Sequence, residues 1–146
     1  MYELVLLPVD GSKHADRAAR RGFDLAEQFG ADVHIVGVVE TGLLGSIRLP
    51  GERESAENAF SREVRSIVDR TAAEADERGL NTSQEVRHGV PVTEILACVD
   101  EVGADLVVMS SRGRGGVDRL MLGSVTEGVT RYGQVDVLVV QSSPPE

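Results

Sequence analysis

The chain is most informative where an apolar run meets small and basic residues, in Leu106-Val107-Val108-Met109-Ser110-Ser111-Arg112-Gly113. Nine residues separate Gly113 from a second segment, Gly123-Ser124-Val125-Thr126-Glu127. The first segment has the composition of a buried strand, and the second has that of a helix start. Amides at the start of a helix carry roughly +0.5 charge and bind anions, and small residues let a phosphate approach the main chain. The layout predicts a phosphate cradle between strand and helix.

Apolar runs alternate with helical patterns along the rest of the chain. The expected strands cover residues 4–7, 33–39, 82–88, 106–109 and 135–140. The expected helices cover residues 12–29, 52–78, 92–102 and 124–132. A glycine follows each helix, where a left-handed conformation would end it at low cost; these are Gly30, Gly79, Gly103 and Gly133. The alternation predicts a parallel sheet with helices on both faces.

The composition of the strands predicts their order in the sheet. Residues 4–7, 33–39 and 106–109 are almost entirely apolar, as central parallel strands are. Residues 82–88 are polar, which places that strand at an edge. With strands numbered along the chain, the order 3-2-1-4-5 meets both conditions. We therefore expect one α/β domain over residues 1–146, with a three-layer, flavodoxin-like, five-stranded parallel sheet.

The last strand is unusually apolar for the edge position that this order gives it. Residues 135–140 read Val-Asp-Val-Leu-Val-Val. An exposed apolar edge strand invites pairing with another chain. The sequence therefore predicts a homodimer through the fifth strand. The alternative, that helices alone cover both faces of this strand, stays open.

Composition excludes several classes of partner. Net charge is −9 and aromatic residues make up 3% of the chain, which argues against binding nucleic acid or acidic membrane surfaces. No apolar run approaches the length of a membrane span, and no leader precedes the first strand. Cys98 is the only cysteine, so no disulfide forms within the chain. These features predict a cytoplasmic protein.

The order 3-2-1-4-5 also predicts where a ligand binds. It reverses between the first and fourth strands, and ligands of such sheets lie outside the carboxyl ends at that point. The first strand runs into Asp10, whose carboxylate could accept hydrogen bonds from ribose hydroxyls or could help to start the next helix, with Ser12 as its N-cap. Arg112 would add positive charge at the end of the fourth strand, or could simply be solvated. Ser124 and Glu127 have the spacing of a capping box.

Signals for catalysis and for metals are weak. The three histidines, His14, His34 and His88, lie on different expected elements without paired metal-ligand spacing. Cys98 has no histidine signature beside it, and the chain contains neither a Gly-x-Ser-x-Gly elbow nor a P-loop. We therefore expect no catalytic residues and no metal site built by the protein alone.

The chain resembles universal stress proteins of the nucleotide-binding kind over its whole length. The resemblance rests on Pro8-Val9-Asp10-Gly11-Ser12, on Val36-Gly37-Val38-Val39-Glu40 and on Leu122-Gly123-Ser124-Val125-Thr126-Glu127. Members that bind ATP carry Gly-x-x-Gly, nine residues, and then Gly-Ser or Gly-Thr. Here Ser110 replaces the first glycine. Its side chain could crowd the nucleotide or donate a hydrogen bond, and serine is small enough that we expect binding to be retained.

The resemblance implies a role for each matching residue. ATP would bind with its ribose on Asp10 and its adenine edge on the main chain of Val38, between walls formed by Pro8 and Met109. The phosphates, with Mg²⁺ or Mn²⁺ between them, would lie near Ser110 and Arg112 and against the group Gly113, Gly123, Ser124, Val125 and Thr126.

Two functions are consistent with these features. The first is an ATP-binding regulatory or stress-response protein that hydrolyses ATP slowly at most. The second is a dimeric interaction module of the same fold that has lost nucleotide binding, which Ser110 favours. A receiver domain lacks support because residues 82–88 end without an acidic cluster, and a flavodoxin lacks it because aromatic residues are scarce.

Overall fold

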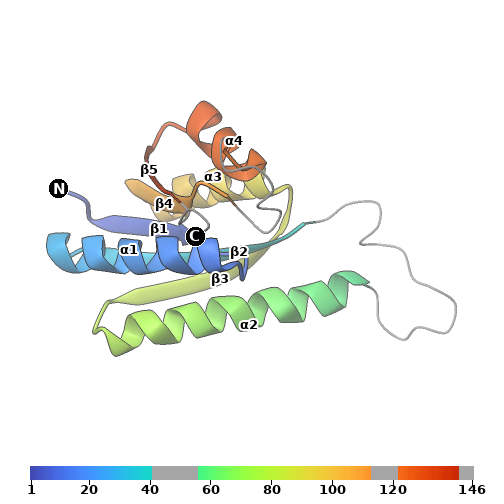
Figure 1. Cartoon of the computed structure of the whole chain (residues 1–146), viewed down its shortest axis with the longest axis horizontal. Coiled ribbons are helices and arrows are strands. Elements are labelled where there is room, and N and C mark those ends of the chain that lie inside the picture. Colours follow the sequence, from blue (N-terminus) through green and yellow to red (C-terminus); the bar gives the residue numbers. More distant parts are fainter. Residues whose placement is uncertain (41–55, 113–121, 142–146) are drawn as a thin grey trace, which may run out of the picture.

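The protein forms a five-stranded parallel sheet in the order β3-β2-β1-β4-β5 (Figure 1). This computed structural model describes residues 1–40, 56–112 and 122–141. The strands are β1 (Leu4–Pro8), β2 (Asp32–Glu40), β3 (Thr82–Gly89), β4 (Leu106–Ser110) and β5 (Asp136–Val140). The helices are α1 (Lys13–Phe29), α2 (Ala56–Glu77), α3 (Pro91–Val102) and α4 (Ser124–Tyr132). The predicted fold class and strand order are confirmed, and residues 52–55 of the expected second helix lie outside the described residues.

Helices cover the sheet in two layers. The helices α1 and α2 lie on one face, and α3 and α4 lie on the other (Figure 1). Because side chains alternate between faces along a strand, Val5 and Leu7 of β1 enter the core under α1 and α2, whereas Leu6 enters the core under α3 and α4. Two apolar cores therefore sandwich the central strands. Within the described ranges, no helix is both long and apolar enough to cross a membrane.

Glycines end the helices in two different ways. Gly30, Gly79 and Gly103 have φ angles of 64°, 79° and 75°, the predicted left-handed conformation. The same prediction is wrong for Gly133, whose φ is −80°. A Cβ at Gly133 would lie 2.6 Å from the main-chain carbonyl oxygen of Val129 and 2.9 Å from a methyl group of Leu96 on α3. Glycine is therefore favoured at this position by the close approach of the main chain of α4 itself and of α3, rather than by the backbone angle.

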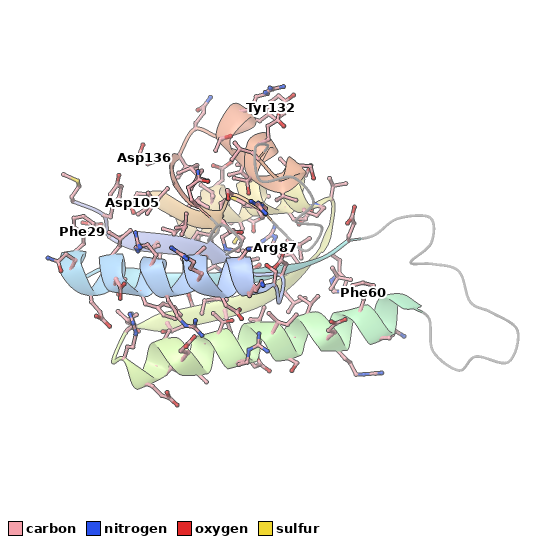
Figure 2. All side chains as sticks on the ribbon, viewed as in Figure 1. Phe29, Phe60, Arg87, Asp105, Tyr132 and Asp136 are labelled. Atoms are coloured by element: carbon pink, nitrogen blue, oxygen red, sulfur yellow. The ribbon has the colours of Figure 1, made fainter. Side chains whose placement is uncertain are left out.

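Polar contacts close the amino ends of the central strands. The carboxylate of Asp105 accepts hydrogen bonds from the amides of Glu3 and Leu4, at 2.9 and 3.1 Å. The Tyr2 hydroxyl donates to Asp136 at 2.8 Å, and this hydrogen bond raises the pKa of Tyr2. Figure 2 places Asp105 and Asp136 near this end of the molecule. The opposite end, where the carboxyl ends of the strands lie, is the end with the predicted ligand site.

Candidate functional site

The ends of β1 and β4 leave the sheet side by side. These strands are adjacent and parallel, with Leu6 opposite Val107. Beyond β1 the amide of Val9 still donates to the carbonyl of Val36 on β2, at 2.9 Å. The chain then turns at Gly11, whose φ of 85° favours glycine. The topological switch point predicted from the sequence therefore lies at the carboxyl ends of β1 and β4.

Asp10 is held at this edge by the turn into α1. Its Oδ1 accepts a hydrogen bond from the amide of Ser12 at 2.9 Å. Ser12 is the N-cap of α1, as predicted, because its Oγ accepts from the amide of Ala15 at 3.0 Å. The structure thus shows the helix-starting role of Asp10. Its predicted ribose contact remains a prediction.

Pro8, Val38 and Met109 lie near the carboxyl ends of three adjacent strands. All three point to the face covered by α3 and α4, because the residues two positions before them pack in the core on that side. The carbonyl of Val36 faces β1, and main-chain groups two residues apart in a strand point to the same side. The main chain of Val38 is therefore directed past the end of β1, where the resemblance puts adenine.

Hydrogen bonds hold the start of α4 onto the end of β4. The hydroxyl of Thr126 donates to the carbonyl of Ser110 at 2.6 Å, and the amide of Gly123 donates to the carbonyl of Ser111 at 2.7 Å. Thr126, Ser110 and Ser111 are all buried. The predicted phosphate-binding residues Gly123–Thr126 therefore lie directly beside the strand end, while Gly113 lies outside the described residues.

The N-cap of α4 is Gly123, so the predicted capping box with Ser124 as N-cap is wrong. Gly123 has an extended backbone, with φ −60° and ψ 152°, and its carbonyl accepts from the amide of Glu127 at 2.9 Å. Ser124 is instead the first helical residue. The first-turn amides have no acceptor within the helix, and no described side chain makes the N-cap hydrogen bond. This end of α4 thus suits an anion.

Ser110 and Arg112 have different surroundings. The Ser110 hydroxyl donates to the carbonyl of Arg112, so it is engaged by the main chain of its own loop. Within the described ranges, Nε of Arg112 is a buried polar atom with no hydrogen-bond partner. A buried donor without an acceptor is costly, and a phosphate oxygen is an acceptor that guanidinium groups bind strongly. A phosphate oxygen at the end of β4 could therefore serve as the acceptor for Nε of Arg112.

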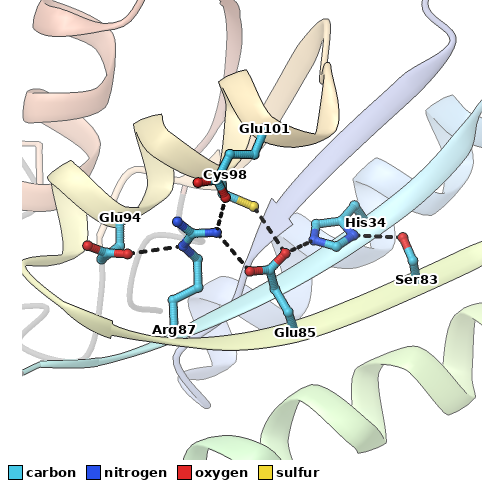
Figure 3. Close-up of polar contacts among 7 residues, drawn as sticks. All are labelled: His34, Ser83, Glu85, Arg87, Glu94, Cys98 and Glu101. Atoms are coloured by element: carbon cyan, nitrogen blue, oxygen red, sulfur yellow. Dashed lines mark hydrogen bonds and ion pairs between the residues drawn. The ribbon is translucent and has the colours of Figure 1, made fainter.

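The structure also assembles a second polar cluster, which the sequence analysis missed. Arg87 of β3 donates hydrogen bonds to Glu85, Glu94 and Glu101, at 2.9, 3.1 and 2.6 Å (Figure 3). These three carboxylates raise the pKa of Arg87. Burial opposes the charge on Glu85, but hydrogen bonds from Arg87 and from His34 outweigh it and lower the Glu85 pKa. Glu85 is therefore ionised in a half-buried position.

Known proteins resemble this chain over most of its length. Universal stress protein MJ0531 of Methanocaldococcus jannaschii is 30% identical over 100% of this chain and 86% of its own length. The solved structure of hypothetical protein MJ0577 matches with a TM-score of 0.82 and 24% identity, covering 99% of each chain. A solved universal stress protein in complex with cAMP matches with a TM-score of 0.72 and 27% identity, covering 97% of this chain and 99% of the other.

The family assignment rests on the full alignment rather than on one motif. A family model described as the Universal stress protein family matches residues 1–141. That range includes both strand ends at the switch point and the start of α4. The chain therefore belongs to the universal stress protein family.

Proposed function

We propose that this protein binds adenine nucleotides, ATP in particular, and acts as a regulatory protein of the stress response. The observation that carries the proposal is the buried, unpartnered Nε of Arg112, close in sequence to a strand end that is hydrogen-bonded to the uncapped start of α4. A polyphosphate would supply the missing acceptor for both groups. The relative solved with cAMP, at 27% identity, supports an adenine nucleotide as the ligand class.

The remaining contacts in this proposal come from residues near the carboxyl ends of β1, β2 and β4. In this proposal Asp10 accepts from the ribose, the Val38 main chain meets the adenine edge, and Pro8 and Met109 form the walls. The phosphates lie near Ser110 and Arg112 and against the segment 123–126; Gly113, which the resemblance adds to this group, lies outside the described residues. Mg²⁺ or Mn²⁺ accompanies the phosphates, whose oxygens are the ligands that such hard cations prefer.

Thermal unfolding with and without ATP and Mg²⁺ tests the proposal. Ligand at 100 times its dissociation constant adds about 2.7 kcal/mol, which for a chain of this size raises Tm by roughly 8 °C. Gly123→Val should abolish the shift by blocking approach to the main chain, and Asp10→Ala should reduce it. Asp100→Ala, an exposed position on α3, is the matched control and should keep the full shift. A wild-type protein whose Tm is unmoved by millimolar ATP contradicts the proposal.

The second candidate function is a dimeric interaction module that binds no nucleotide. The buried Ser110 side chain, in place of the first glycine of the nucleotide motif, is the observation that favours it. Ser110→Gly separates the two functions. If ATP stabilises this variant but not the wild type, the serine blocks the site and the second function holds.

We also propose that the protein is a homodimer paired through β5. This strand pairs with β4 at the edge of the described sheet, and its Leu138 side chain is 36% exposed. Val139→Lys should yield monomers, because lysine on an edge strand opposes further pairing. Val90→Lys, at an exposed position before α3, is the control. Sedimentation velocity decides, and an unchanged coefficient for Val139→Lys refutes pairing through β5.

A further inference from the structure

Three side chains with different ligand atoms meet in the layer between the sheet and α3. They are His34 of β2, Glu85 of β3 and Cys98 of α3 (Figure 3). The Nε2 of His34 lies 2.8 Å from Oε2 of Glu85, and the Cys98 Sγ lies 3.8 Å from the same oxygen. All three ligand atoms lie within 4.8 Å of one another. That spacing suits the coordination of one small cation.

We propose that His34, Glu85 and Cys98 bind a thiophilic divalent cation of the zinc class, separately from the nucleotide. Imidazole, carboxylate and thiolate are the ligands that Zn²⁺ takes in proteins, usually in tetrahedral geometry. Three protein ligands leave the fourth position to water or to a small molecule. His34 and Cys98 are buried, whereas the Glu85 side chain is 32% exposed, so the open position and the entry path lie on the Glu85 side.

Outer contacts already orient two of the three ligands. The Nδ1 of His34 lies 2.6 Å from the Ser83 hydroxyl, whose oxygen can accept a hydrogen bond from Nδ1–H when Nε2 binds a cation. Arg87 donates to Oε1 of Glu85 at 2.9 Å, which leaves Oε2 facing His34 and Cys98. These contacts hold the two side chains in the direction that a cation between them and Cys98 would need.

The charge around the cluster favours a cation. Glu85, Glu94 and Glu101 surround the single guanidinium of Arg87, so three negative charges and one positive charge leave a formal charge of −2. A divalent cation that displaces the Cys98 proton adds a net charge of +1 and so reduces this negative excess.

Binding exchanges the thiol proton of Cys98 for the metal. The Sγ of Cys98 donates to Oε2 of Glu85 at 3.8 Å, so the sulfur carries a proton before the cation arrives. As the sulfur–metal bond forms, the S–H bond breaks and its proton goes to solvent. The Nε2 lone pair of His34 is available to the cation when the ring carries its proton on Nδ1, toward Ser83.

Cobalt titration of the reduced full-length chain tests the proposal. Co²⁺ replaces Zn²⁺ in such sites and gives a thiolate-to-cobalt charge-transfer band. Because Cys98 is the only cysteine, any such band reports this residue. We expect the band to saturate at one Co²⁺ per chain and to vanish when Zn²⁺ is added.

Variants distinguish this site from adventitious binding. Cys98→Ala should lose the band, and His34→Asn should weaken Co²⁺ binding at least tenfold, whereas His14→Asn and His88→Asn remove the other histidines and should leave it unchanged. Circular dichroism checks that each variant is folded. No band in folded wild-type protein, or an unchanged affinity in His34→Asn, overturns the proposal, whatever the outcome of the ATP measurements.

Discussion

Replacing Arg87 with methionine should destabilise the fold in a pH-dependent manner. Methionine keeps an apolar stem of similar length and removes the guanidinium. The Arg87 side chain is 15% exposed and holds Glu85, Glu94 and Glu101 within 3.1 Å. Without it, three carboxylates remain close together with no positive partner. Burial would then act on Glu85 with only its interactions with His34 to oppose it.

The magnitude follows from the burial of the partners. Breaking a fully buried ion pair by removing one partner costs about 3–5 kcal/mol, whereas exposed pairs contribute about 0–1 kcal/mol. Two of the partners are half-buried and Glu101 is 62% exposed. We therefore expect a loss of about 2–3 kcal/mol near neutral pH, equivalent to roughly 6–9 °C in Tm.

The sign of the pH dependence tests the electrostatic cause. The Glu85 pKa lies below its ordinary value of 4.5. The stability that ionised Glu85 contributes is therefore present above that pH and is lost as pH falls through the folded-state pKa. The gap between wild type and Arg87→Met should therefore shrink on going from about pH 7 to about pH 4. Urea unfolding at both pH values measures it. A gap that is independent of pH, or no larger than that of the exposed control Arg20→Met, refutes the reasoning.

Three further predictions concern single contacts. Thr126→Val removes a buried donor to the Ser110 carbonyl and should cost about 1–3 kcal/mol, more than Thr126→Ser, which keeps the hydroxyl; urea unfolding showing the valine variant to be the more stable would contradict this. Gly22→Ala gains about 1 kcal/mol of helix propensity, but its Cβ would lie 2.4 Å from a methyl of the buried Leu7, so overpacking of about 1–3 kcal/mol should win and Tm should fall. An unchanged or higher Tm would show that Leu7 can move aside. The pKa of Tyr2 is raised, so the stability that its hydroxyl contributes is present below pH 10.0 and is lost as pH rises through the folded-state pKa. Tyr2→Phe should therefore flatten the alkaline decline in Tm. An identical decline in both proteins would exclude a role for this hydroxyl.

The fold class could be predicted because the polarity of the strands and the alternation of strands with helices together limit the possible sheet topologies. Polar residues at 82–88 and apolar residues at 4–7 leave few parallel orders, and the structure has the expected one. The glycines after the helices predicted three helix ends correctly, because the left-handed conformation depends on the glycine itself and needs no distant neighbour. The prediction of a left-handed angle is wrong at Gly133, where the space for a Cβ is taken by the Val129 carbonyl oxygen and by Leu96 on another helix.

The capping residue of α4 and the His34 cluster depend on neighbours that are distant in sequence. Ser124 has the right spacing to cap, but the carbonyl of Ser111 binds the amide of Gly123 and sets the helix start one residue earlier than a Ser124 cap requires. His34 is the one strongly polar side chain inside an apolar strand, and it lies opposite Ser83 in the sheet. Alternation could predict which face of the sheet it occupies, but not that Cys98 of α3 lies against that face.

The two proposed sites share β2 but are separate enough to test independently. His34 and the Val38 main chain lie four residues apart, which is about 13 Å along a strand. Substitutions at one position should therefore leave the measurement for the other intact: His34→Asn should keep the ATP shift, and Asp10→Ala should keep the cobalt band. A variant that loses both has lost the sheet itself, because β2 joins β1 and β3 through continuous pairing. Measuring both signals on every variant thus distinguishes loss of a ligand contact from unfolding.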